Sequence, residues 1–125
     1  MCIRDRHGTT GFVHHPERQS AVVFVHDDPD AAWAELGPYL LDEHREYCSW
    51  RDDSVPRPHE DPVDTVAALR GQGKVHILTP DQCRSDIASG RRELVLHPLA
   101  GGVPLAESWK SLTLFVEQVL PRVDR

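Results

Sequence analysis

Three short apolar runs divide the chain and predict its β-strands. Residues 21–25 are continuously aliphatic or aromatic, and residues 74–78 and 93–97 form two further apolar runs. A strand that is apolar at every position, rather than at alternate ones, is typical of a sheet covered on both faces. We therefore expect buried parallel strands with helices packed on each side.

Apolar residues three and four positions apart predict a long helix after the first run. Asp28 can accept a hydrogen bond from the first free N–H groups of that helix, and Pro29 suits its first position. An interior Gly37-Pro38 pair predicts a kink, because the proline removes one backbone hydrogen bond. The predicted buried face consists of Trp33, Leu36, Leu40, His44 and Tyr47.

Three more helices follow from similar signals. After a charged, proline-rich loop over residues 49–62, Asp61-Pro62 predicts the start of a short helix that ends at Gly71. Thr79 and Gln82 form a capping box that opens the next helix, which ends at Gly90. A final helix, ended by Pro121, carries a stripe predicted to pack on the core: Leu105, Trp109, Leu112, Val116 and Val119. This alternation of strands and helices predicts a parallel α/β fold.

Composition and charge argue against some classes of partner and indicate where the protein is located. The 125 residues carry a formal charge of −6, and their basic residues are dispersed among acids, which argues against nucleic acid and anionic membranes as partners. There is no apolar run near the ~20 residues of a membrane span and no signal peptide, so we expect a cytoplasmic protein. Residues 1–7 lack periodicity and are interpreted as a non-native leader, with residues 8–125 as the native part.

Several segments together resemble the carboxy-terminal third of the luciferase-like flavin-dependent monooxygenase family. The likeness covers about residues 20–122, and it depends on the order and spacing of its parts. One departure from the family pattern is Leu78, where many relatives have a glycine before the Thr-Pro pair. The segments are 23–25, 27–30 with Trp33, 34–41, Thr79-Pro80, 96–99, 111–112 and 120–121.

The resemblance implies a (β/α)₈ barrel, of which this chain would hold only the last two strands, residues 21–25 and 93–97. It also implies reduced flavin (FMN) or a deazaflavin as cofactor, a small organic substrate, and a homodimer. Barrels often bind phosphate in the loops after their last strands. His97, Gly101 and Gly102 occupy that position and are the candidate cofactor-binding residues. Most catalytic residues of the family would lie upstream, so we expect this chain alone to be inactive.

Other chemistry receives little support from the residues. His14, His15 and His26 match no zinc spacing, so no metal site is predicted. Cys48 and Cys83 have no base nearby in the sequence and are expected to be structural thiols.

Two alternatives to a flavin-dependent monooxygenase remain open. One is a parent enzyme that is a deazaflavin-dependent dehydrogenase. The other is a non-catalytic α/β interaction module that dimerises through a helix face containing Leu105, Trp109 and Leu112.

Overall fold

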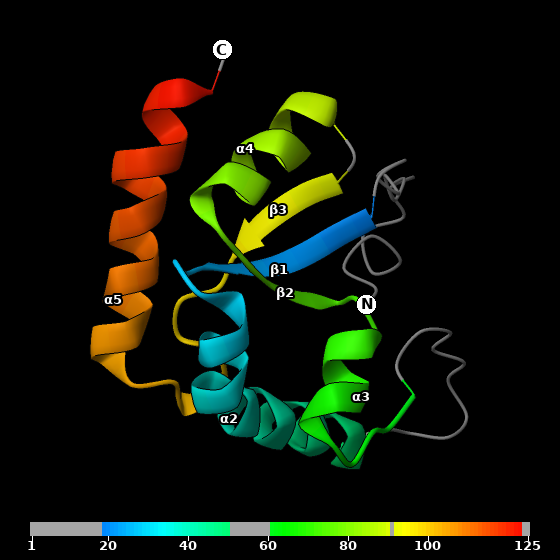
Figure 1. The fold of residues 1–125 in the computed structure, drawn as a ribbon. Helices are drawn as coiled ribbons and strands as arrows, with labels where there is room; N and C mark the ends of the chain where they lie inside the picture. The colour runs from blue at the N-terminus through cyan, green and yellow to red at the C-terminus, as the bar shows by residue number, and fades with distance from the viewer. Residues whose placement is uncertain (1–18, 51–60, 91, 124–125) are drawn as a thin grey trace, which may run out of the picture.

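A computed structural model describes residues 19–50, 61–90 and 92–123 (Figure 1). The proposed leader and the pair His14-His15 lie outside these ranges, as does most of the predicted loop over residues 49–62. The elements are β1 (Gln19–Val25), α2 (Pro29–Ser49), α3 (Val66–Gly71), β2 (Val75–Leu78), α4 (Pro80–Ser89), β3 (Arg92–Leu96), a 3-10 turn (Ala100–Gly102) and α5 (Leu105–Leu114).

The three strands form one parallel sheet in the order β2-β1-β3. Val25 of β1 pairs with Leu78 of β2, and Val23 pairs with Leu96 of β3. The predicted α/β class is therefore confirmed. β1 and β3, which the resemblance assigns to the last two strands of a barrel, are neighbours, but β2, which lies between them in the sequence, pairs with the other side of β1, so a partial barrel is not confirmed.

Helices cover both faces of this sheet. On one face, Phe24 and Ile77 pack in a cluster with Trp33, Leu36 and residues of α3. On the other face, Val23 and Val25 pack against Cys83 of α4 and Val119. All three side chains from Val23 to Val25 are almost fully buried, which confirms that β1 is covered on both sides.

β3 is less buried than its sequence predicts. Val95 is 43% exposed, and Leu94 and Leu96 are only partly buried. The reason is its position, because β3 lies at one edge of the sheet and pairs only with β1 among the described strands. The apolar run predicted the strand correctly, but the strand is less buried than the run predicted.

Two helices, α2 and α4, begin with the predicted capping side chain. The Asp28 carboxylate accepts a hydrogen bond from Ala31 N–H at 3.2 Å, and Thr79 and Gln82 form both bonds of a capping box. The predicted start at Asp61-Pro62 is wrong. α3 begins after Thr65, whose hydroxyl accepts a hydrogen bond from Ala68 N–H at 3.1 Å, so a closer capping residue is used.

α2 continues through Pro38 and ends at Ser49. Figure 1 shows that it changes direction partway along its length, in agreement with the predicted kink. At the same point Gly37 lets α3 approach closely, since a Cβ there would lie 2.4 Å from Val66 Cγ1. Trp33, Leu36 and Leu40 are buried as predicted, whereas His44 is only partly buried and Tyr47 is exposed.

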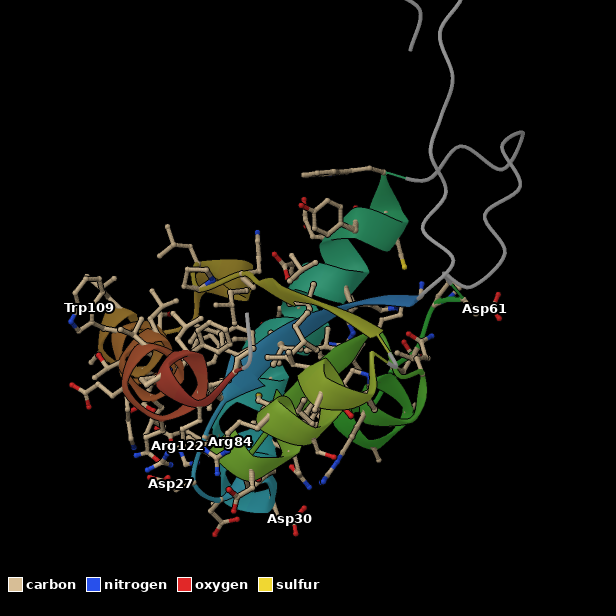
Figure 2. The ribbon with its side chains drawn as sticks, turned by 90° about the horizontal axis from the view of Figure 1, so that it is seen from above. Asp27, Asp30, Asp61, Arg84, Trp109 and Arg122 are labelled. Atoms are coloured by element: carbon tan, nitrogen blue, oxygen red, sulfur yellow. The ribbon has the colours of Figure 1, made fainter. Side chains whose placement is uncertain are left out.

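The last helix packs with a face that the sequence did not indicate. Ser108 and Ser111 are its buried residues, while Leu105, Trp109 and Val116 are exposed and Leu112 is partly buried. Within the predicted stripe only Val119 is fully buried. Figure 2 shows Trp109 on the outer side of α5, away from the sheet. The helical path also continues past α5, through a π-helical segment (Phe115–Val119) and a 3-10 turn (Leu120–Arg122), so Pro121 does not end it.

The buried serines of α5 face the end of the central strand. Val25 is the last residue of β1, and its backbone N–H donates a 2.8 Å hydrogen bond to Ser111 Oγ. Figure 1 shows α5 running across the end of the sheet where β1 and β3 finish. The pairing of β1 with β3 ends at Val23 and Leu96, so the buried N–H of Val25 has no acceptor on β3. Ser111 supplies that acceptor, which explains why a polar residue of α5 faces inward.

Candidate functional site

The carboxyl ends of the strands lie at one edge of the sheet, because all three run parallel. In open α/β sheets, ligands bind outside this edge at the point where successive connections leave in opposite directions. Here the chain passes from β1 to β2, which pairs with one side of β1, and then crosses to β3, which pairs with the other side of β1. The switch point is therefore between β1 and β3, and the loop after β3 is the predicted cofactor loop, His97 to Gly102.

This loop is a compact turn packed on α2. Ala100 N–H donates to His97 O at 3.3 Å, and Val103 N–H donates to Ala100 O at 3.0 Å. Gly101 and Gly102 have φ angles of 59° and 70°, a left-handed conformation that favours glycine.

The two glycines have different surroundings. A Cβ on Gly101 would lie 2.5 Å from the carbonyl oxygen of Tyr39, so this glycine is required for contact between the loop and α2. A Cβ on Gly102 would meet nothing within 4 Å. Gly102 and the imidazole of His97 are exposed. These two residues, rather than Gly101, are accessible to a ligand.

α5 limits the space at the same edge. Ser111 Oγ accepts the hydrogen bond from Val25 N–H, so α5 occupies the space at the end of β1. A ligand at this edge would therefore lie beside the loop rather than between the ends of β1 and β3. The arrangement offers an imidazole and exposed backbone, which can bind polar groups of a ligand. It offers no neighbouring cation within the loop to hold a phosphate.

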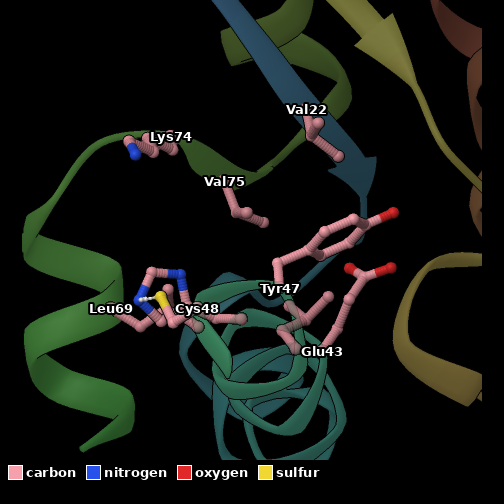
Figure 3. A pocket seen from close by; sticks show the side chains of 9 residues that line it. Val22, Glu43, Tyr47, Cys48, Leu69, Lys74 and Val75 are labelled. Carbon is pink, nitrogen blue, oxygen red and sulfur yellow. Dashed lines mark hydrogen bonds between the residues drawn. The ribbon is translucent and has the colours of Figure 1, made fainter. Parts of the chain in front are cut away.

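A cavity of about 280 Å³ lies on the α2 face of the sheet (Figure 3), and it adjoins the loop at Glu43, whose Cβ would lie 3.3 Å from a Cβ on Gly101. Its lining combines aliphatic side chains with polar and aromatic ones. Figure 3 shows Lys74 on the opposite side of the cavity from Glu43 and Tyr47. The lining residues are Val22, Leu40, Glu43, His44, Tyr47, Cys48, Leu69, Lys74 and Val75.

This cavity contains a contact that the sequence interpretation missed. Cys48 Sγ lies 3.5 Å from His44 Nε2, so the statement that Cys48 has no base nearby is wrong. The signal was present, because residues four apart on a helix lie on the same side. The thiol and the imidazole lie within hydrogen-bond distance, and the thiol is partly buried at the cavity wall.

Cys83 has the opposite character. It is fully buried between α4 and the sheet, and this burial, with a smaller contribution from Asp86, raises its pKa from 9.0 to about 11. A thiol with so high a pKa remains protonated at neutral pH, and it is unreactive because the thiolate is the nucleophile. The prediction that Cys83 is structural agrees with this environment.

The histidines show no sign of metal binding in the described part of the chain. No group of three or more His, Cys, Asp or Glu side chains there is arranged to hold a metal ion. His26 instead accepts a hydrogen bond from Asp28 N–H through Nδ1 at 2.9 Å, which ties it to the turn after β1.

Comparisons with known proteins identify no relative. Family models, curated proteins and solved structures all gave no match. Among residues 19–50, 61–90 and 92–123, no helix is both long and apolar enough to cross a membrane.

Proposed function

We propose that the chain is part of a luciferase-like flavin-dependent oxidoreductase, in which the His97 to Gly102 loop lies against the cofactor. The proposal depends on the resemblance over about residues 20–122. The observation that supports it best is the position of this loop, which follows β3 at the switch point of the parallel sheet. A cofactor position derived from sheet topology thus coincides with the loop that the resemblance indicates.

The residues of the loop would have separate roles. Gly101 holds the turn against the Tyr39 carbonyl, and Gly102 leaves backbone exposed for close approach of a ligand. The His97 imidazole would hydrogen-bond to a polar group of the cofactor. Reduced flavin would supply the electrons that activate dioxygen toward a small organic substrate, and the protein would position it and exclude water.

The (β/α)₈ barrel is the part of the proposal that agrees least with the observed sheet. In a (β/α)₈ barrel the helices lie only on the outer face, and strands are neighbours in chain order. In this structure helices cover both faces of β1, and the order β2-β1-β3 is typical of an open, doubly wound sheet. A barrel containing these strands would need one helical layer to leave the sheet and β2 to lie between β1 and β3. The flavin proposal itself requires only the carboxyl edge and its loop.

Two alternatives follow from specific features. A deazaflavin parent, acting as a dehydrogenase, would use the same loop because the two cofactors share a ring system of similar shape. A non-catalytic interaction module is favoured by the exposed apolar residues of α5.

Cofactor titration tests the proposal. FMN and a deazaflavin would each be added to the full chain, and binding followed by the change in cofactor fluorescence. We expect saturable binding that H97A weakens by at least about tenfold, the effect of losing one good polar contact of about 1.4 kcal/mol. G102V should also weaken binding, because its side chain would block the approach of the cofactor to the backbone. H44A, in the separate cavity, is the matched histidine control and should leave binding unchanged. Saturable binding of neither cofactor, or equal loss in H44A and H97A, would overturn the proposal.

A further inference from the structure

The last turns of α2 carry a thiol and an imidazole on one side of the helix. Cys48 Sγ and His44 Nε2 are 3.5 Å apart, and the spacing of four residues means that the helix itself holds the two side chains together. In the tautomer that carries its proton on Nδ1, the Nε2 atom is an acceptor for the S–H group. The thiol therefore has a base beside it, which is the arrangement that activates a nucleophile.

This pair is accessible to a small molecule. Cys48 and His44 are each only partly buried, and both line the cavity of about 280 Å³ on the α2 face of the sheet. Figure 3 shows Cys48 on the side of the cavity that faces α3. Cys83, by contrast, is fully buried between α4 and the sheet. Of these two thiols, only that of Cys48 opens into a cavity.

The cavity lining favours a ligand with a hydrocarbon body. Aliphatic side chains from four different elements, β1, α2, α3 and β2, meet around it, and Figure 3 shows Val75 directed into the space. An aliphatic chain bound beside Cys48 would therefore be covered from several directions and removed from water. The aliphatic lining residues are Val22, Leu40, Leu69 and Val75.

The size and charge of the cavity restrict the ligand further. Lys74 and Glu43 contribute one charge of each sign to the lining, and they lie on opposite sides of the cavity in Figure 3. Their charges balance, so neither an anion nor a cation is favoured over an uncharged molecule. A volume of about 280 Å³ is at the lower end of the range for ligand sites, roughly 300–1,000 Å³. The expected ligand is therefore small and neutral.

We propose that this cavity binds a small, neutral α,β-unsaturated aldehyde or ketone with an aliphatic tail, and that Cys48 adds to it with His44 as the base. His44 Nε2 accepts the thiol proton while Sγ forms a bond to the β-carbon of the ligand. The electron pair of the C=C bond moves toward the carbonyl group to give an enolate, and the imidazolium then returns the proton to the α-carbon. The product is a thioether, formed without an oxidant or a reductant.

Conjugate addition suits this site better than a displacement reaction. A displacement at sulfur or carbon would release a charged leaving group into a largely aliphatic cavity, where an unpaired charge is costly. Addition releases nothing, and the tail of the ligand stays against the aliphatic lining. The inference is independent of the flavin proposal, because neither His97 nor Gly102 lines this cavity.

A series of vinyl ketones tests the apolar part of the site. Methyl vinyl ketone and its ethyl, propyl and pentyl homologues share one reactive group and differ only in tail length. Each would be added to the full chain, and the rate of adduct formation at Cys48 measured by peptide mass analysis, relative to the rate with N-acetylcysteine. We expect the relative rate to rise up to about fourfold for each CH₂, equivalent to about 0.8 kcal/mol of buried hydrocarbon, until the cavity is full.

One substitution in the lining tests where the tail lies. V75T keeps the shape of the side chain and replaces a methyl group with a hydroxyl, so the dependence on tail length should become weaker while methyl vinyl ketone reacts as before. V95T is the matched control, because Val95 lies on β3 outside the cavity and is 43% exposed. A rate that is independent of tail length in the wild-type chain, or an equal change in V75T and V95T, would overturn the proposal.

A second substitution tests the base. A positioned base typically contributes about 10²-fold or more, so H44A should lower the rate at Cys48 by at least about tenfold for every homologue. The dependence on tail length should remain, which a collapsed cavity would not allow. H26A is the histidine control, because His26 lies in the turn after β1 and does not line the cavity. An unchanged rate in H44A, or an equal loss in H26A, would refute the role of His44 and with it the proposal.

Discussion

Gly101 provides a sharp test of how the loop after β3 is held. Replacing it with alanine places a Cβ 2.5 Å from the Tyr39 carbonyl oxygen and 2.9 Å from its carbon, both of them backbone atoms of α2. Backbone cannot move aside as a flexible side chain can, so the loop or the helix must shift. Overpacking of this kind costs about 1–3 kcal/mol. The left-handed φ of 59° adds about 1–2 kcal/mol for any residue with a Cβ.

Gly102 is the matched control, since it has a similar φ of 70° but open space around its Cα. G102A should lose only the conformational part, about 1–2 kcal/mol. G101A should therefore be less stable than G102A by about 1–3 kcal/mol, the cost of the steric overlap. Urea unfolding followed by tryptophan fluorescence measures both free energies of unfolding. Equal losses in the two variants would refute the contact between the loop and α2.

Three further predictions concern the buried serine Ser111 and the thiols of Cys83 and Cys48. S111A leaves the buried N–H of Val25 without its partner and should lower the free energy of unfolding by about 1–3 kcal/mol. S108A is its control, because among the described residues the Ser108 hydroxyl donates to Pro104 O, at the start of the same helix, and a similar loss in both variants would contradict this reasoning. The raised pKa of Cys83 means that the unfolded chain loses this proton at lower pH than the folded one, so stability should fall as pH rises from 9 to about 11. C83A should lack that part of the decrease, and identical pH profiles for the two proteins would disprove the assignment. At neutral pH, in a C2S background, an alkylating reagent followed by peptide mass analysis should label Cys48 well before Cys83.

Local signals in the sequence predicted the elements well, for identifiable physical reasons. The apolar run over residues 21–25 reflects the central position of β1, since the two helical layers bury its side chains from Val23 to Val25 on both faces. The caps at Asp28 and Thr79 were predicted because a capping side chain and its backbone donor are only two or three residues apart. The start of α3 was missed because Asp61 and Thr65 are both good caps, and the sequence alone does not rank two nearby candidates.

The sheet order and the candidate site depended on contacts that no local pattern contains. The position of β2 beside β1, and the closeness of Gly101 to Tyr39, join residues far apart in the chain. The pair His44 and Cys48 was the exception, since helical spacing alone brings these side chains together. It was missed because His44 is not adjacent to Cys48 in the sequence but lies one helical turn before it.

The last helix shows why an apolar stripe does not by itself identify a buried face. The stripe at Leu105, Trp109 and Val116 has the spacing of a core-facing surface, yet the helix turns its serines inward. The sheet decides this orientation, because β1 extends beyond its pairing with β3 and leaves the N–H of Val25 needing an acceptor. A serine hydroxyl supplies that acceptor and lets the helix approach the strand end closely, whereas a leucine there would do neither. The same hydrogen bond therefore leaves Leu105, Trp109 and Val116 on the exposed side of the helix.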